Sequence, residues 1–107
     1  MSIVITDDEH FNSVFEDNKS EPMILFFTAS WCGPCQQIKP FLEKSAGELI
    51  GKLTVLKIDV DECDEICQKY SVTTMPTFIL IVHGVPTENF SGANETKLQE
   101  MIDNALE

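Results

Sequence analysis

The sequence has few positively charged side chains. Only seven of its 107 residues are Lys or Arg, against eighteen Asp or Glu, so the formal net charge is -11. Proteins that bind nucleic acid or an anionic membrane surface carry clustered Lys and Arg that contact phosphates. The acidic excess therefore argues against both kinds of partner, and it favours solubility and encounters with basic surfaces.

Long hydrophobic runs, internal repeats and low-complexity linkers are also missing. No stretch approaches the roughly 18 apolar residues of a membrane span, and no basic flank precedes an apolar segment at the start, as a secretory signal requires. The few glycines form no nucleotide-binding motif. We therefore expect a cytosolic protein with one domain, residues 1–107.

Two hydrophobic periods alternate along the chain. Continuous apolar segments predict buried strands, and apolar residues at helical spacing predict the helices between them. The expected strands are 3–5, 23–29, 53–60, 77–82 and 86–90, and the expected helices are 6–18, 34–49, 63–70 and 94–105. Strands separated by helices pair in parallel, and the late hairpin adds antiparallel pairing. The predicted fold is α/β, with a central mixed five-stranded sheet flanked by four α-helices.

Three residues predict where helices begin or bend. Thr6 and Glu9 have the spacing of a capping box, so we expect Thr6 to cap the first helix. Asn94 is expected to cap the last helix. Pro40 falls inside the second helix and is expected to kink it, because proline lacks an N–H group and crowds the preceding turn.

Cys32 and Cys35 carry the clearest chemical signal. They flank Gly33 and Pro34 directly after a buried strand, where the 34–49 helix begins. A helix N-terminus presents unpaired N–H groups and a partial positive charge, which stabilise a thiolate relative to a thiol. We expect Cys32 at the surface just before the first turn, with Cys35 one turn further in. Where thiols are kept reduced, such a pair is more often catalytic or metal-binding than structural.

The expected chemistry of this pair is thiol–disulfide exchange. The Cys32 thiolate attacks a disulfide of another protein and forms a mixed disulfide. Cys35 then attacks the sulfur of Cys32, which releases the reduced substrate and leaves a disulfide between the two cysteines.

Several motifs, taken in order, resemble the thioredoxin family over essentially the whole chain. They are Trp31-Cys32-Gly33-Pro34-Cys35, Pro40, Lys57-Ile58-Asp59, Met75-Pro76-Thr77 and Phe90-Ser91-Gly92-Ala93. The resemblance implies the thioredoxin fold and a protein-disulfide reductase with catalytic Cys32 and Cys35. It also implies that no cofactor is bound, and that electrons come from NADPH through a thioredoxin reductase. That reductase and disulfide-containing substrate proteins would be the partners.

The resemblance also assigns supporting residues to the site. Pro76 is expected in the cis form facing the cysteine pair, which leaves the backbone of Met75 free to pair with a substrate peptide. Asp61 is expected to brace Trp31. A shallow apolar groove would receive the substrate, lined by Trp31, Gly33, Pro34, Val60, Thr74, Met75, Gly92 and Ala93.

Phe26 departs from the family pattern. The position six residues before the first cysteine usually carries a buried Asp in the family, which takes the proton of the second cysteine and pairs with the residue matching Lys57. Phe26 cannot accept a proton, so we expect Cys35 to lose its proton to water or to the departing Cys32 sulfur, more slowly at neutral pH. We expect the ammonium of Lys57 to reach water or Asp59 instead.

The second pair of cysteines, Cys63 and Cys67, shares one side of a short helix with Ile66 and Tyr70. Packing as small apolar residues is the main interpretation. The alternative is redox regulation through Cys63, by an intermolecular disulfide that links two copies of an otherwise monomeric chain. A disulfide between Cys63 and Cys67 would need local unwinding, because their side chains point in parallel.

No metal is expected from the sequence. The spacing of the four cysteines does not match a zinc site. The acidic run 59–65 lacks the Gly and Glu of a calcium loop. His10 and His83 have no partnering motif and are expected at the surface or at an edge.

Two functions remain open at this point. The first is a dithiol electron carrier that reduces protein disulfides and maintains the cell's redox balance. The second is a redox-sensing module that binds a partner in one oxidation state and releases it in the other. An isomerase-like domain is disfavoured, because Gly33-Pro34 resembles the reducing members of the family.

Overall fold

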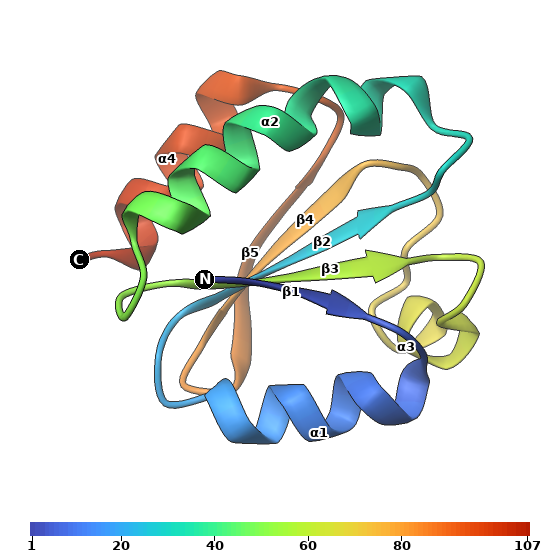
Figure 1. Cartoon of the computed structure of the whole chain (residues 1–107), viewed down its shortest axis with the longest axis horizontal. Coiled ribbons are helices and arrows are strands. Elements are labelled where there is room, and N and C mark those ends of the chain that lie inside the picture. The colour runs from blue at the N-terminus through green and yellow to red at the C-terminus, as the bar shows by residue number, and fades with distance from the viewer.

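Strands and helices alternate along the chain until a hairpin joins the last two strands (Figure 1). The computed structural model describes all residues 1–107. Its elements are β1 (Ser2–Ile5), α1 (Asp8–Asn18), β2 (Met23–Thr28), α2 (Gly33–Glu48), β3 (Thr54–Asp59), α3 (Asp64–Lys69), β4 (Thr77–Val82), β5 (Val85–Ser91) and α4 (Glu95–Ala105). No helix is long and apolar enough to cross a membrane.

The five strands form one mixed sheet in the order β1-β3-β2-β4-β5. The first three are parallel, while β4 runs antiparallel to β2 and β5 antiparallel to β4. His83 and Gly84 join β4 to β5, with φ values of 52° and 79°. A two-residue hairpin turn with positive φ at both positions matches the twist of the strands that it connects. The predicted mixed sheet with four helices is confirmed.

Helices cover both faces of this sheet, α2 and α4 on one face and α1 and α3 on the other (Figure 1). Strand residues that point toward α2 and α4 form one apolar cluster with those helices. This cluster includes Phe26, Phe78, Cys32 and Cys35. Their neighbours in sequence, such as Leu25 and Phe27, join a second cluster with α1 and α3. Because both faces are covered, β2 is a continuous apolar run rather than an alternating one.

The cap of α1 differs from the prediction by one residue. Asp7, rather than Thr6, is the N-cap, and its carboxylate accepts a hydrogen bond from the backbone N–H of His10 at 2.8 Å. The backbone N–H of Thr6 donates in turn to Nδ1 of His10 at 3.0 Å. The predicted capping box is wrong, because the ring of His10, and not the side chain of Glu9, accepts the hydrogen bond from the backbone N–H of Thr6.

The other two helix predictions have different outcomes. Asn94 caps α4 as predicted, its side chain accepting from the N–H of Lys97 at 3.0 Å. The helix α2 continues through Pro40, whose missing N–H leaves the carbonyl of Gln36 without its usual helical donor. The kink expected at Pro40 stays a prediction.

Asp8 ties α1 to α3, which the sequence did not reveal. Its carboxylate accepts hydrogen bonds from the backbone N–H groups of Ile66 at 3.0 Å and Glu65 at 3.3 Å. Cys63, the N-cap residue of α3, makes no side-chain capping bond. The unpaired N–H groups of α3 are therefore satisfied by a carboxylate from a distant helix.

Replacing Asp8 should weaken the fold through this contact. We expect Asp8→Ala to lower the free energy of unfolding by about 1–2 kcal/mol, since a charged cap is lost. Urea unfolding followed by circular dichroism measures this. Glu9→Ala is the matched control, because Glu9 lies in the same first turn and makes no hydrogen bond through its side chain. Equal losses in the two variants would contradict the role given to Asp8.

Candidate active site

The N-terminus of α2 holds the sulfur of Cys32. Cys32 is the N-cap residue, with extended backbone (φ -91°, ψ 107°), and its Sγ accepts a hydrogen bond from the backbone N–H of Cys35 at 3.2 Å. Pro34 lies in the first turn of the helix, where an N–H has no helical partner and proline is therefore tolerated. This arrangement places the sulfur where the helix dipole and a direct N–H donor both favour a negative charge.

Cys32 and Cys35 are joined by a disulfide in the structure, with their Cα atoms 5.3 Å apart. The pair is accessible from one side only. Cys32 is 6% exposed, whereas Cys35 is completely buried. A disulfide in another protein can therefore approach Cys32 but not Cys35, as the order of the expected reaction requires.

The turn from β2 into α2 is fixed by the carbonyl of Ala29. This oxygen accepts hydrogen bonds from the backbone N–H of Cys32 at 3.1 Å and from Nε2 of Gln36 at 3.2 Å. The end of a buried strand and the first turns of the helix thus share one acceptor. The position of Cys32 is consequently tied to the core of the sheet.

Trp31 lies exposed beside the pair and is held by a chain of two carboxylates. Its indole N–H donates to Oδ2 of Asp61 at 2.9 Å, the contact that the family resemblance implied. The backbone N–H of Asp61 donates in turn to Oδ1 of Asp59 at 2.9 Å. The sequence did not indicate this second contact. With 65% of its surface exposed, Trp31 depends on these bonds for its orientation.

The segment with Pro76 and the loop with Gly92 meet in space. The Met75–Pro76 peptide bond is cis, and the backbone N–H of Gly92 donates to the carbonyl of Pro76 at 2.9 Å. Gly92 has φ of 102°, a conformation that a residue with a side chain rarely adopts. The backbone N–H and C=O of Met75 make no hydrogen bond within the chain, so they remain free for an extended peptide.

The remaining groove residues differ in burial. Val60 and Met75 are half-buried and pack against the apolar cluster that contains Cys32 and Cys35. Thr74 and Ala93 are exposed, as are Gly33 and Pro34. The carbonyl of Thr74 accepts from the hydroxyl of Thr77 at 2.6 Å, which fixes the backbone next to Met75.

Phe26 occupies the core beneath the cysteine pair. Its ring stacks on Phe78 with centroids 5.1 Å apart, and Phe78 stacks on Phe90 at 4.9 Å. Thr54 and Thr77 are the only polar residues among the buried ones. No buried carboxylate is therefore available to take a proton from Cys35.

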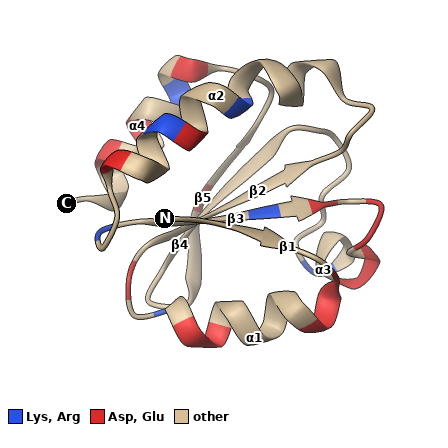
Figure 2. Cartoon of the chain, viewed as in Figure 1, with Lys and Arg blue, Asp and Glu red and all other residues tan.

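Lys57 is the only lysine in a strand (Figure 2), and its partner differs from the prediction. Its ammonium pairs with Oε1 of Glu43 from α2 at 2.7 Å rather than with Asp59 or water alone. The hydroxyl of Ser2 also donates to this carboxylate, at 3.2 Å. Burial alone would raise the pKa of Glu43, but the hydrogen bond and charge of Lys57, with Ser2 and Lys39, lower it overall.

Cys63 packs as a small apolar residue, as the main interpretation expected. It is completely buried in the cluster under α1 and α3. Burial, reinforced by the negative charges of Asp8, Cys67, Asp59 and Asp7, raises the pKa of Cys63 to about 12. Burial, followed by Asp64 and other acidic neighbours, also raises the pKa of the half-buried Cys67. The folded chain does not present Cys63 to a second copy, so the alternative of a dimer linked through Cys63 is not supported.

The environment of Cys63 predicts slow alkylation. With a pKa near 12, its thiolate fraction at pH 8 is about a thousandfold below that of an ordinary thiol, because each pKa unit is a factor of ten. We expect iodoacetamide, applied to the oxidised protein, to modify Cys67 before Cys63. Peptide mass spectrometry gives both rates, and a Cys67→Ser variant shows the Cys63 rate alone. Labelling of Cys63 as fast as a free thiol would contradict this environment.

Three comparisons place this geometry among known proteins. The thioredoxin family model matches residues 2–104. The thioredoxin of Staphylococcus epidermidis is 39% identical over 107 residues, which covers 99% of this chain and 100% of that protein. The solved structure of Fasciola hepatica thioredoxin has a TM-score of 0.88 and 42% identity, and the match covers 95% of this chain and 97% of that one.

A fourth similarity involves a longer protein. The bifunctional thioredoxin reductase/thioredoxin of Mycobacterium leprae is 40% identical over 93 residues, which covers 87% of this chain but 20% of that protein. Together with the helix N-terminus that carries the Cys32–Cys35 disulfide, these similarities identify the chain. It belongs to the thioredoxin family and is a protein-disulfide reductase that acts through Cys32 and Cys35.

Proposed function

We propose that Cys32 is the attacking thiolate and Cys35 the resolving thiol in the reduction of disulfides in other proteins. One observation carries this assignment. The sulfur of Cys32 accepts the N–H of Cys35 at the start of α2, and Cys32 is the member of the pair that is not completely buried. A thiolate stabilised by a helix N-terminus is the reactive form in disulfide exchange.

The proposed cycle moves two electrons from the protein to the substrate. The Cys32 thiolate bonds to one sulfur of the substrate disulfide, and the other substrate sulfur leaves as a thiolate. Cys35 gives up its proton and bonds to the sulfur of Cys32, which breaks the mixed disulfide and releases the second substrate thiolate. The Cys32–Cys35 disulfide that remains is the oxidised form of the protein.

The substrate peptide would lie along the free backbone of Met75. Neither polar group of this residue is used within the chain, and an extended peptide binds such groups as an added strand would. Val60, Thr74, Gly92 and Ala93 would form the walls, with Trp31 and Pro76 on either side of the reacting sulfur. Asp61 would hold Trp31 in place through the indole N–H.

Reduced protein would be regenerated by a thioredoxin reductase that draws on NADPH. The Mycobacterium leprae relative joins a thioredoxin reductase and a thioredoxin in one chain, which supports this pairing. The protein itself would bind no cofactor, act as a monomer and work in the cytosol, where reducing conditions keep such a pair supplied with electrons.

Turnover tests the proposal directly. We expect catalytic reduction of insulin, with a small dithiol as the electron source, to be lost in Cys35→Ser, because the mixed disulfide can no longer be resolved within the chain. Cys67→Ser is the matched control and should retain turnover. If the intact protein does not turn over although its disulfide opens and closes reversibly, the redox-sensing module replaces the reductase.

Phe26 should make resolution of the mixed disulfide depend steeply on pH. Without a buried acid, the proton of Cys35 passes to solvent, and the thiolate fraction of a thiol rises about tenfold per pH unit until most of it is ionised. We therefore expect the single-turnover resolution rate to rise by about this factor per unit between pH 6 and 8. The fluorescence of Trp31, the only Trp, follows the reaction.

Two variants at position 26 separate the proton effect from packing. Phe26→Asp should flatten the pH dependence and speed resolution at neutral pH, because a carboxylate can accept the proton. Phe26→Leu removes the ring stack but adds no base, so it should keep the steep dependence. A resolution rate of the intact chain that does not change between pH 6 and 8 would contradict the role given to Phe26.

A further inference from the structure

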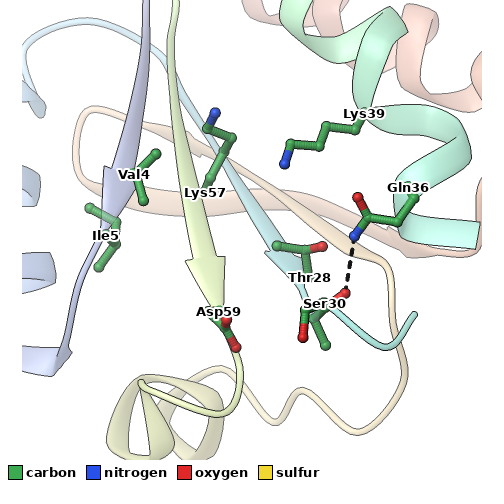
Figure 3. Close-up of a pocket in the computed structure, with 9 residues that line it drawn as sticks. Val4, Ile5, Thr28, Ser30, Gln36, Lys39, Lys57 and Asp59 are labelled. Atoms are coloured by element: carbon green, nitrogen blue, oxygen red, sulfur yellow. Dashed lines mark hydrogen bonds between the residues drawn. The ribbon is translucent and has the colours of Figure 1, made fainter. Parts of the chain in front are cut away.

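A cavity of about 290 Å³ lies beside the active pair and contains neither cysteine (Figure 3). It opens where β2 and β3 end and the first turns of α2 begin. Its polar lining residues are Thr28, Ser30, Gln36, Lys39, Lys57 and Asp59. Ligands of open α/β sheets bind outside the carboxyl ends of the strands, and this volume lies at the lower end of small-molecule pockets.

One cation and one carboxylate oxygen in this cavity form no direct ion pair or hydrogen bond. Lys57 is engaged by Glu43 at 2.7 Å, whereas Lys39 makes no ion pair and no side-chain hydrogen bond. Asp59 uses Oδ1 to accept from the N–H of Asp61, which leaves Oδ2 free. Figure 3 shows Lys39 extending from α2 toward the cavity, with Asp59 at the opposite end. The cavity therefore offers one positive and one negative group to a single occupant.

Hydrogen-bonding groups lie between these two charges. Thr28 and Ser30 make no hydrogen bond through their hydroxyls. Gln36 donates its Nε2 to the carbonyl of Ala29, so its amide oxygen remains free to accept. A ligand of a few atoms that carries both an acceptor and a donor would find partners for each.

The charges decide the class of ligand. A simple anion would be opposed by the net charge of -11, and a simple cation by the ammonium group of Lys39, which forms no ion pair. A zwitterion carries no net charge, so neither effect opposes it. We propose that the cavity binds a small zwitterion, a free α-amino acid or a molecule that ends in one, with its carboxylate on Lys39 and its ammonium on Asp59.

A ligand in this cavity would change the environment of Trp31. The carboxylate of Asp59 accepts from the backbone N–H of Asp61, and the carboxylate of Asp61 accepts from the indole N–H of Trp31. A ligand ammonium bound to Asp59 would therefore perturb the first of these two hydrogen bonds. The Trp31 fluorescence is therefore an optical signal for binding, in addition to the amide chemical shifts of the lining residues. Because the chain stays oxidised throughout the titration, changes in either signal report binding rather than disulfide reduction.

The test is a titration of the oxidised full-length chain with L-serine. We expect saturable changes in the amide chemical shifts of Thr28, Ser30 and Lys39, with a Kd on the order of 1 mM. Acetate and methylamine each carry one of the two charges, and each should bind at least about tenfold more weakly. An adventitious surface effect would instead produce shifts that grow without saturation.

Lys39→Gln removes the proposed carboxylate partner and should abolish the saturable shifts while insulin reduction continues. Lys44→Gln, an exposed lysine on the same helix outside the cavity, should leave binding unchanged. Asp59→Asn keeps an acceptor for Asp61 but loses the charge, so binding should also be lost. The proposal is overturned if L-serine gives no saturable shift, if acetate binds equally well, or if Lys39→Gln binds like the unmodified chain.

Discussion

The hydrogen bond from the N–H of Cys35 to the sulfur of Cys32 is the contact on which the active site depends. It exists because the chain leaves β2 at Thr28, turns at Ala29 and enters α2 at Gly33 with Cys32 as the cap. The carbonyl of Ala29 fixes that turn by accepting two hydrogen bonds. Because β2 lies in the middle of the sheet and is buried on both faces, the turn that carries the sulfur is anchored directly to the core.

The core beneath this contact is apolar, and that determines how protons can move. Phe26, Phe78 and Phe90 form a continuous stack from β2 to the edge strand β5. The charged residue nearest in register to Phe26 is Lys57, which is neutralised from the other side by Glu43 on α2. The protein thus keeps the helix N-terminus that stabilises the thiolate but has no buried acid for the resolving cysteine. In the proposed cycle the fold supports the first reaction step, whereas the second relies on solvent.

The acidic surface has a local exception near this site. Acidic residues gather around α3 and on α1 (Figure 2), whereas Lys39 of α2 and Lys57 of β3 line the cavity beside the active pair. Asp59 belongs to both regions, since it lines this cavity and its carboxylate accepts a hydrogen bond from the backbone N–H of Asp61. The orientation of Trp31 and the polarity of the cavity are therefore linked through the side chain of Asp59.

Much of this structure could be predicted from local sequence. The apolar runs of β2 and β4, the capping Asn94 and the apolar spacing in α2 gave elements whose ends agree with the structure to within one residue. The cysteine pair could be placed because its chemistry depends on the helix that starts between the two residues. Burial of Cys63 also followed from the spacing of its apolar neighbours.

The missed contacts join residues far apart in the chain. Glu43 meets Lys57, and Asp8 meets the N-terminus of α3, only after the sheet has formed and the helices have packed on it. Their partners were not predictable from spacing, because several exposed carboxylates compete for each site in a sequence with eighteen of them. The cap of α1 was missed for a local reason, since the ring of His10 replaced the expected glutamate as acceptor.

The most direct test of the account is to identify the sulfur that first bonds to a substrate. Reduced Cys35→Ser protein is mixed with a disulfide-containing peptide, and the adduct is located by peptide mass spectrometry under non-reducing conditions. The account predicts one persistent mixed disulfide on Cys32, since this sulfur is both reachable and stabilised by the helix. An adduct on Cys63 or Cys67, or no adduct at all, would contradict it.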